Sequence, residues 1–317
     1  MLKPSISVII PVYNEAKSLP ELHAALTPLY ADFPETEVVF VDDGSKDEGL
    51  SVLKQIAAKD SRVKIISFHR NHGQTAAILA GIDHAEGDIL IPMDSDLEND
   101  PADIPLLIAE LGKGSDVVSG WRQDRWKDNY MARKIPSMAA NKLISIMTGV
   151  HLHDYGCTLK AYRREVLAGV PLYGEMHRFI PAYASWQGAM VSEIPVKYTP
   201  RKFGKSNYGI SRTVRVLLDL LLIKFLHRYM NRPIHFFGGL GVMLFVASVA
   251  VIVLALALRF WLNISLIQTP LPLLSALCMI MGLNLVMMGV LSEMQMRTYY
   301  EAQKTKPYRV KEKINFG

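Results

Sequence analysis

Short apolar runs alternate with longer stretches of helical spacing through the first 120 residues of this 317-residue chain. Helical patterns fill residues 18–30, 49–59 and 73–84, and a further helix begins near Pro101. Continuous apolar runs rich in β-branched residues are typical of buried parallel strands. The runs read SISVIIPVY, EVVFVDD, VKIISF, GDILIPMD and SDVVSG. Because strand and helix alternate, the pattern predicts an α/β domain with an open, mostly parallel sheet and helices on both faces.

The last third of the chain carries two long uncharged runs. The first extends from Pro233 to Leu258, and the second extends from Leu271 to Leu291. Each supplies about 20 or more apolar residues, enough for a helix to cross a hydrocarbon core of about 30 Å. A buried core helix is the alternative, but such helices rarely stay uncharged over this length. The sequence therefore predicts two transmembrane helices.

Basic residues flank this pair of runs on both outer sides, whereas the connection between the runs offers only Arg259. The positive-inside rule therefore places both the N-terminal domain and the C-terminal tail in the cytoplasm. Residues 210–231 are helical in pattern with charges on more than one side, which favours two short helices at the membrane surface. We expect a cytoplasmic α/β domain at 1–209, interface helices at 210–232, a membrane region at 233–292 and a basic cytoplasmic tail at 293–317.

The composition adds few constraints to this picture. The formal net charge is +5, and the two cysteines are Cys157 and Cys278. Because Cys278 lies in a predicted span, no disulfide or metal framework follows, which fits a reducing compartment. The opening MLKPSISVIIPVY runs directly into strand-like sequence, and its apolar part is too short for a secretory signal. The basic residues beside the apolar runs suit an anionic lipid surface, and no nucleic-acid partner is expected.

Polar clusters follow three of the predicted strands. The carboxyl ends of parallel strands meet along one rim, where α/β proteins bind their ligands. One cluster opens the acidic segment MDSDLENDP, whose four carboxylates repel one another unless a cation lies among them. Such a segment is either a solvated turn or an oxygen-rich site for Mg²⁺ or Mn²⁺, and its place at the rim favours the metal site. The clusters are Tyr13-Asn14-Glu15, Asp42-Asp43-Gly44-Ser45 and Asp94-Ser95-Asp96.

Several of these motifs together resemble a known family. VIIPVYNE, VDDGSKD, RNHGQTAAILAG and MDSDLENDP are similar to the nucleotide-sugar domain of family 2 glycosyltransferases, which has the GT-A fold. RKIPSMAANKL, DYGCTLKAYRREV and RKFGKSNY, followed by two spans, resemble the polyprenyl-phosphate glycosyltransferases of that family. This group includes dolichol-phosphate mannose synthases, bactoprenol glucosyltransferases and the undecaprenyl-phosphate aminoarabinose (formamido-arabinose) transferase. The last is the nearest match, because of the segment DYGCTLKAYRR.

The resemblance implies roles for the residues at the rim. Asp94 and Asp96 would hold the metal and the diphosphate, with Glu98 as a further ligand where the mannose synthases have glutamine. Asp100 is interpreted as a turn or helix-capping residue before Pro101. Strand packing explains two of the nucleotide-site assignments, Pro11 and Val41, equally well. The residues implied to bind the nucleotide sugar are Pro11, Tyr13, Glu15, Val41, Asp43, Asp94, Ser95, Arg201 and Lys205.

Residues further along the chain complete the implied site. Arg201 and Lys205 belong to RKFGKSNY, which resembles a loop that closes over the diphosphate but has Asn207 in place of the family's lysine. Asp154 would act either as a base or as an orienting group, and the sequence leaves both roles open. The residues implied to contact the acceptor phosphate are Arg122, Arg133 and Ser137. The residues implied to take part in catalysis are Asp154, Asp96 and Arg122.

The implied activity is an inverting, metal-dependent transfer of a sugar from a nucleoside-diphosphate sugar to a polyprenyl phosphate such as undecaprenyl phosphate. UDP is favoured over GDP, and the product would serve cell-envelope glycan or lipopolysaccharide modification at the inner membrane. The resemblance also implies a homo-oligomer, with a tetramer as the expected form. The nearest alternative is a GDP-mannose-dependent mannose synthase. Two other classes are a nucleotidyltransferase, which would not need two spans, and a non-catalytic membrane scaffold, which would not need the acidic and basic residues of the site.

Overall fold

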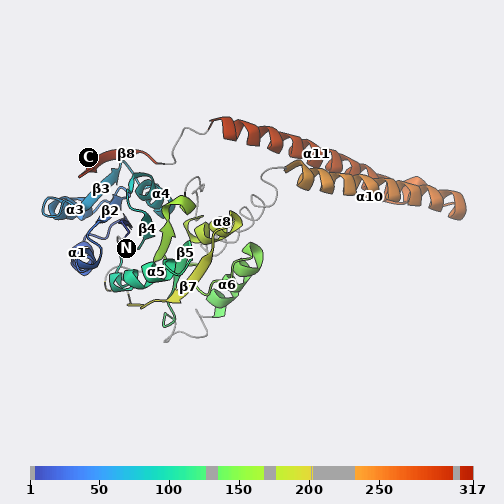
Figure 1. The fold of residues 1–317 in the computed structure, drawn as a ribbon. Helices are drawn as coiled ribbons and strands as arrows, with labels where there is room; N and C mark the ends of the chain where they lie inside the picture. Colours follow the sequence, from blue (N-terminus) through green and yellow to red (C-terminus); the bar gives the residue numbers. More distant parts are fainter. Residues whose placement is uncertain are drawn as a thin grey trace. The chain divides into compact units, whose positions relative to one another are not determined.

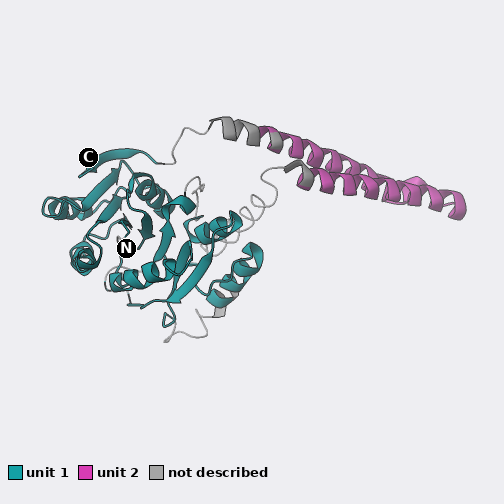
Figure 2. Ribbon diagram, viewed as in Figure 1, with its two compact units in different colours: residues 1–220, 306–317 teal, residues 221–305 magenta. Residues whose placement is uncertain are grey.

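A computed structural model of the chain has two kinds of region, an α/β sheet with helices and a pair of long helices (Figure 1). The structure describes residues 4–125, 135–167, 176–200, 202, 233–302 and 308–316. The chain forms two compact units, Met1–Leu220 with Lys306–Gly317 and Leu221–Thr305 (Figure 2). The expected interface helices at 210–232 lie outside the described residues. So do three expected site residues, Arg133, Arg201 and Lys205.

Among the described residues, the first unit contains one eight-stranded sheet with the order β7-β5-β6-β4-β1-β2-β3-β8. Neighbours in the series β4-β1-β2-β3 are parallel, as are β5 and β7. Strand β6 runs antiparallel to β4 and β5, and β8 runs antiparallel to β3. The predicted α/β fold with a mostly parallel sheet is therefore confirmed. The strands are β1 (Ile6–Val12), β2 (Thr36–Asp42), β3 (Val63–Phe68), β4 (Ile89–Pro92), β5 (Val117–Trp121), β6 (Lys160–Arg163), β7 (Val191–Pro195) and β8 (Val310–Ile314).

The helices follow the expected positions, with one division. Residues 18–30 form two helices rather than one, because Pro28 lacks the N–H needed to continue the first and instead precedes the second. Prolines also lie in the first turns of α5 and α8. A backbone N–H in the first turn has no acceptor within the helix, so proline costs no helical hydrogen bond there. The helices are α1 (Leu19–Leu26), α2 (Leu29–Asp32), α3 (Gly49–Ala57), α4 (Gln74–His84), α5 (Ile104–Leu111), α6 (Ile135–Thr148), α7 (Arg164–Leu167) and α8 (Ile180–Trp186), with 3₁₀ turns η1 (Pro101–Asp103) and η3 (Met176–Phe179).

Alternate residues of the sheet form separate cores on its two faces. Val38 and Phe40 of β2 pack in a cluster that includes apolar residues of α1, α3 and α5. Val39 and Val41 pack in a second cluster with alanines of α4. Helix α4 approaches β1 closely at Gly81. A Cβ at this position would lie 2.2 Å from the Ile9 side chain, so only glycine fits. This packing holds α4 against β1, and a hydrogen bond from Gln74 to Asp94 places the start of α4 beside the residues that follow β4.

Strand β8 adds the end of the chain to the edge of the sheet. Within residues 293–317, expected as a basic cytoplasmic tail, helix α11 continues to Ala302 and Val310–Ile314 pairs with β3. Lys54 of α3 forms an ion pair with Glu312 at 2.9 Å. The Asn315 side chain donates hydrogen bonds to the carbonyl oxygens of Ala57 and Val63. The segment that follows the two long apolar helices therefore returns to the unit that precedes them.

Tyr308 anchors this returning segment. Its ring stacks on Phe68 with a centroid distance of 5.3 Å, and its hydroxyl donates a 2.6 Å hydrogen bond to Asp83. We expect Tyr308→Ala to lower the free energy of unfolding by about 3 kcal/mol, as for other buried aromatic residues. The exposed neighbour provides a matched control, and Arg309→Ala should change stability by no more than about 0.5 kcal/mol. Chemical denaturation of the detergent-solubilised protein measures both variants, and equal effects would contradict an anchoring role.

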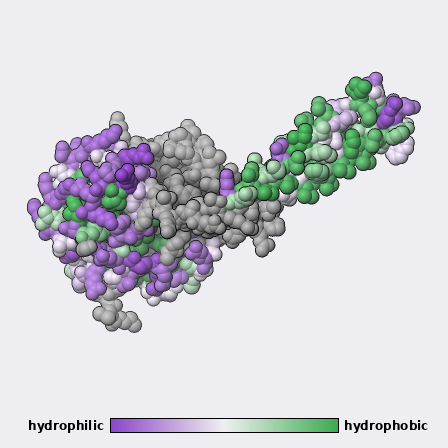
Figure 3. Space-filling model, turned by 90° about the horizontal axis from the view of Figure 1, so that it is seen from above, coloured by the Kyte–Doolittle hydropathy of each residue, from purple (hydrophilic) through white to green (hydrophobic). Residues whose placement is uncertain are grey.

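The second unit consists of two long apolar helices, α10 (Pro233–Leu262) and α11 (Leu271–Ala302), with the 3₁₀ turn η4 (Leu266–Gln268) between them. Within these helices, Phe236–Leu262 and Leu271–Ser292 are long and apolar enough to cross a membrane. The backbones approach closely at two glycines, since a Cβ on Gly241 would lie 2.7 Å from the carbonyl oxygen of Gly282. The surface of the helix pair is largely apolar (Figure 3), as expected of helices that contact lipid.

Candidate active site

The carboxyl ends of β1, β2 and β4 bring the three polar clusters to one rim of the sheet. Parallel pairing aligns Val12 with Asp42 and Ile9 with Pro92, so the residues that follow each strand lie near one another. The loops after β1 and β2 are also tied together. The backbone N–H of Asn14 donates to the Ser45 hydroxyl at 3.1 Å, and the Asn14 side chain accepts from the N–H of Lys46 at 2.8 Å. Tyr13, the residue before Asn14, has 42% of its surface exposed.

Two of the expected nucleotide-site residues have clear packing or structural contacts. The Asp43 carboxylate accepts hydrogen bonds from the backbone N–H groups of His72 at 2.6 Å and Gly73 at 2.8 Å. Burial raises the pKa of Asp43, while these hydrogen bonds favour its ionised form. Val41 is fully buried in the core that faces α4. Asp43 therefore ties the end of β2 to the start of α4, and Val41 acts at least as a packing residue.

Asp94 lies where β4, α4 and the loop before β6 meet. Its Oδ1 accepts a 2.6 Å hydrogen bond from the Gln74 amide, and its Oδ2 accepts a 2.7 Å hydrogen bond from the Thr158 hydroxyl. Burial, together with the nearby charge of Asp96, raises the pKa of Asp94 to about 6. Two carboxylates this close suit a divalent cation, which would offset their charge. The Asp94–Asp96 pair therefore fits the metal expected from the sequence.

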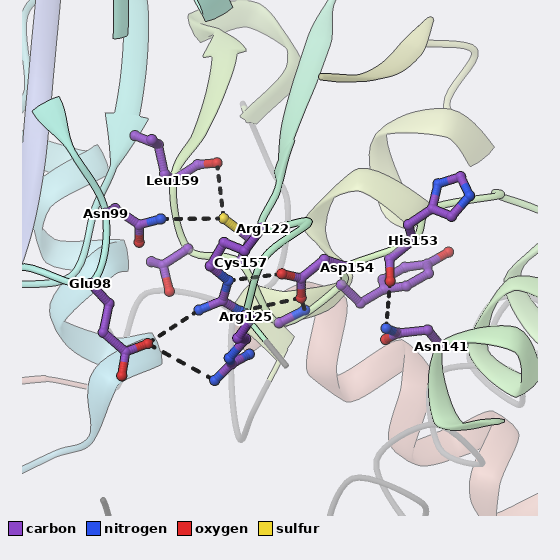
Figure 4. Close-up of polar contacts among 12 residues, drawn as sticks. Glu98, Asn99, Arg122, Arg125, Asn141, His153, Asp154, Cys157 and Leu159 are labelled. Carbon is purple, nitrogen blue, oxygen red and sulfur yellow. Dashed lines mark hydrogen bonds and ion pairs between the residues drawn. The ribbon is translucent and has the colours of Figure 1, made fainter. Parts of the chain in front are cut away.

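Glu98 faces arginines instead of joining this pair. Its Oε2 lies 3.4 Å from an Nη of Arg122 and 4.0 Å from an Nη of Arg125 (Figure 4). Leu97, between Asp96 and Glu98, has a left-handed backbone with φ of 64°. Among the residues that the structure describes, no group of three or more His, Cys, Asp or Glu side chains is arranged to hold a metal. The expected three-carboxylate ligand set is thus not assembled, because Glu98 is paired with cations.

Arg122 and Asp154 form a buried, bidentate ion pair. The Arg122 Nε and Nη2 atoms donate to the two Asp154 oxygens at 2.8 and 3.2 Å, and only 2% of the Arg122 side chain is exposed (Figure 4). Burial alone would raise the pKa of Asp154, but the charge and hydrogen bonds of Arg122 lower it to about 2. A carboxylate with so low a pKa is a weak proton acceptor. The geometry therefore favours Asp154 as a group that orients Arg122 over Asp154 as a base.

The turn that carries Asp154 is fixed from two strands. Glu193 of β7 accepts hydrogen bonds from the backbone N–H groups of His153 at 3.0 Å and Asp154 at 3.1 Å. Lys160 of β6 is buried and donates to the carbonyl oxygens of Tyr155 and Cys157. The same turn delivers Thr158 to Asp94. The acidic pair and the Arg122–Asp154 pair are therefore connected by one short, well-supported segment.

The remaining expected residues are less closely tied to this cluster. Ser95 is buried, Pro11 and Glu15 are half-buried at the rim, and Ser137 is half-buried on α6. Four residues that contact the site have no role predicted from the sequence: Gln74, Thr158, Lys160 and Glu193. The first three stand inside motifs that carry the family resemblance, whereas no signal in the sequence pointed to Glu193.

A family model described as glycosyl transferase family 2 matches residues 7–170, which is more than half of the chain. The chain belongs to glycosyltransferase family 2. The expected family is therefore confirmed, and the protein is a glycosyltransferase. Its matched region contains the rim, the acidic pair and the Arg122–Asp154 pair.

Two relatives within this family match nearly the whole chain. The glycosyltransferase is 40% identical to a dodecaprenyl-phosphate galacturonate synthase of Rhizobium johnstonii, over 97% of this chain and 92% of that protein. It is 36% identical to an undecaprenyl-phosphate 4-deoxy-4-formamido-L-arabinose transferase of Enterobacter sp., over 98% of this chain and 94% of that protein. A glucosyl-3-phosphoglycerate synthase of Mycobacterium tuberculosis, solved with Mn²⁺, UDP and phosphoglyceric acid, matches 70% of this chain and 78% of its own. With a TM-score of 0.55 and 18% identity, this match supports the GT-A fold alone.

Proposed function

We propose that this glycosyltransferase transfers a sugar from a UDP-linked donor to a polyprenyl phosphate, with inversion at the anomeric carbon and with Mg²⁺ or Mn²⁺ bound at the acidic pair. The observation that carries the proposal is the partly buried Asp94–Asp96 pair beside the Arg122–Asp154 ion pair at the rim. Support comes from the two full-length relatives, both named for polyprenyl-phosphate sugar transfer. The two apolar helices suit an acceptor that stays in a bilayer.

The residues of the site would act on two anionic groups, the leaving diphosphate and the acceptor phosphate. A divalent cation on Asp94 and Asp96 would supply charge neutralisation for the diphosphate that leaves the sugar. Gln74 and Thr158 hold the Asp94 carboxylate in position through hydrogen bonds to its two oxygens. Arg122, oriented by Asp154, would stabilise the negative charge where the two phosphate groups approach. The acceptor phosphate is already an anion at neutral pH, so the reaction needs no strong base.

The sugar and the membrane arrangement follow from the same relatives and from the chain path. The names of the two relatives contain galacturonate and 4-deoxy-4-formamido-L-arabinose. We propose these two sugars first as the group that is transferred from the donor. We further propose that the catalytic unit faces the cytoplasm at the inner membrane, and that the protein acts as a homo-oligomer. Basic residues before α10 and after α11 support this orientation. The pairing of β8 with β3 of the first sheet supports a topology in which both outer ends of the helix pair lie on one side.

Transfer of labelled sugar to an extractable lipid tests the proposal. Purified full-length protein is given undecaprenyl phosphate and a panel of UDP- and GDP-sugars, with Mn²⁺, with Mg²⁺ or with a chelator. We expect metal-dependent product from UDP-galacturonate or the UDP-formamido sugar, and inversion at the anomeric carbon by NMR. Product from GDP-mannose alone would favour the mannose synthase alternative, and nucleotide-sugar synthesis without lipid product would favour a nucleotidyltransferase.

A reporter fused after Gly317 tests the proposed topology. The reporter should be cytoplasmic, and a periplasmic reporter would contradict the topology.

A further inference from the structure

The span of α11 contains one carboxamide that the helix pair leaves without a partner. Ser248 and Ser275 satisfy each other, because each hydroxyl donates to the other residue's carbonyl oxygen, at 2.8 and 2.9 Å. Asn284 is exposed, and its side chain makes no hydrogen bond to any residue that the structure describes. It stands 13 residues after Leu271 and 8 residues before Ser292, the ends of the apolar span. At 1.5 Å per residue, it lies about 20 and 12 Å from these ends, well inside the span.

Asn284 also faces away from α10. The contacts with α10 run along the face that contains Ser275 and Gly282. At about 100° per residue, Asn284 is turned roughly 180° to 200° from these two positions. Its neighbours on the outer face are apolar and at least half exposed. They are Leu277, Met281, Met288 and Leu291.

A carboxamide on such a face is unfavourable in hydrocarbon unless it finds a hydrogen-bond partner. A neutral lipid tail offers no donor or acceptor, and Asn284 is too deep in the span for its short side chain to reach the interface. The side chain carries both a carbonyl acceptor and an N–H₂ donor, so two copies of the same residue can satisfy each other across a twofold axis. The surrounding apolar residues would pack around that central pair.

We infer that the outer face of α11 is an interface with a second copy of this chain, in which the two Asn284 side chains hydrogen-bond to each other. The inference rests on the proposed membrane location, since only in a bilayer does the exposed amide need such a partner. Helices from two copies inserted in the same orientation run parallel, so position 284 of one copy meets position 284 of the other. The interface also gives a physical basis for the expected homo-oligomer, and it lies outside the catalytic rim.

Dilution of the full-length protein in vesicles tests this interface. Donor- and acceptor-labelled copies are reconstituted in phosphatidylethanolamine and phosphatidylglycerol vesicles, and energy transfer is followed as lipid is added. We expect Asn284→Leu to weaken self-association about 5- to 30-fold, the range measured for amide contacts between model transmembrane helices. Asn284→Gln, which keeps the amide, and Met288→Leu on the same face should each stay within about twofold of wild type. A monomeric wild type, or an unchanged Asn284→Leu variant, would overturn the inference.

Cross-linking gives a second readout, which reports which face of α11 lies at the contact between copies. In a Cys278→Ala background, Met288→Cys should form a disulfide-linked dimer under mild oxidation. Val290→Cys should not, because position 290 is turned well away on the helix. Equal cross-linking at both positions would indicate random collision and contradict the interface. Resistance to carbonate extraction and formation of lipid-linked sugar are measured on the same vesicles. Failure in either of these two assays would count against the proposed function, while failure of cross-linking alone would count against the interface.

Discussion

Replacing Asp94 by asparagine is expected to lower the turnover number about 100- to 1000-fold without destabilising the protein, the scale seen when one electrostatic stabiliser is removed. The substitution removes a charge that burial and Asp96 already disfavour, as the raised pKa of about 6 indicates. Asparagine keeps the shape of the side chain. Its carbonyl can accept from the Gln74 amide, and its N–H₂ can donate to the Thr158 hydroxyl in place of the present hydrogen bond. Stability should therefore be unchanged or slightly higher while activity is lost.

Turnover and thermal unfolding measured on the same preparations, with and without Mn²⁺, check this expectation. Mn²⁺ should raise the unfolding temperature of the wild type but not that of the variant, because binding to the folded state alone stabilises it. Asp100→Asn is the matched control from the same acidic segment. Asp100 caps η1 through a 3.0 Å hydrogen bond from the N–H of Ala102, so this change should leave turnover within about twofold. If the Asp94 variant kept normal turnover, or still responded to Mn²⁺, the acidic pair would not be the metal site.

The central strands were predictable because burial on both faces leaves an uninterrupted apolar run. Strands β1 to β5 all arise from such runs in the first 120 residues. Strands β6, β7 and β8 gave no comparable signal. Strand β8, for example, reads VKEKI, and its residues alternate between half-buried and exposed. It forms because β3 offers an open edge and Tyr308 packs beside it, which are tertiary effects that no local pattern contains.

The site shows the same division between local and tertiary information. Strand-end clusters on parallel neighbours were expected to meet, and Asn14 after β1 does form hydrogen bonds with Ser45 and Lys46 after β2. Within the cluster after β4, Asp96 lies close enough to raise the pKa of Asp94. The pairing of Arg122 with Asp154 joins residues 32 positions apart, and it depends on how β6 and β7 support the intervening turn. Glu98 was expected near the metal because the family resemblance implies a further ligand at this position. The left-handed residue at Leu97 and the two nearby arginines give it a different environment.

Arg122→Met is expected to lower the free energy of unfolding by about 3 to 5 kcal/mol, because it leaves Asp154 buried without its cation. Glu98 loses a cationic neighbour as well, although Arg125 remains near it. The double variant Arg122→Met/Asp154→Leu removes both members of the buried pair. It should recover much of the lost stability, since replacing a whole buried ion pair by apolar groups is often close to neutral. Chemical denaturation of the single and double variants forms the cycle that measures this coupling.

Turnover measurements separate the effect of this ion pair on stability from its effect on sugar transfer. Both variants should stay at least about 100-fold below wild-type turnover, because neither restores a guanidinium beside the reacting phosphates. Arg122→Lys keeps the charge but loses the planar fork that meets both oxygens of Asp154, so it should fold while recovering only part of the activity. A double variant with wild-type turnover would show that Arg122 acts only through stability. A double variant as unstable as the single one would show that the loss arises elsewhere, since position 154 would then hold leucine and no uncompensated charge.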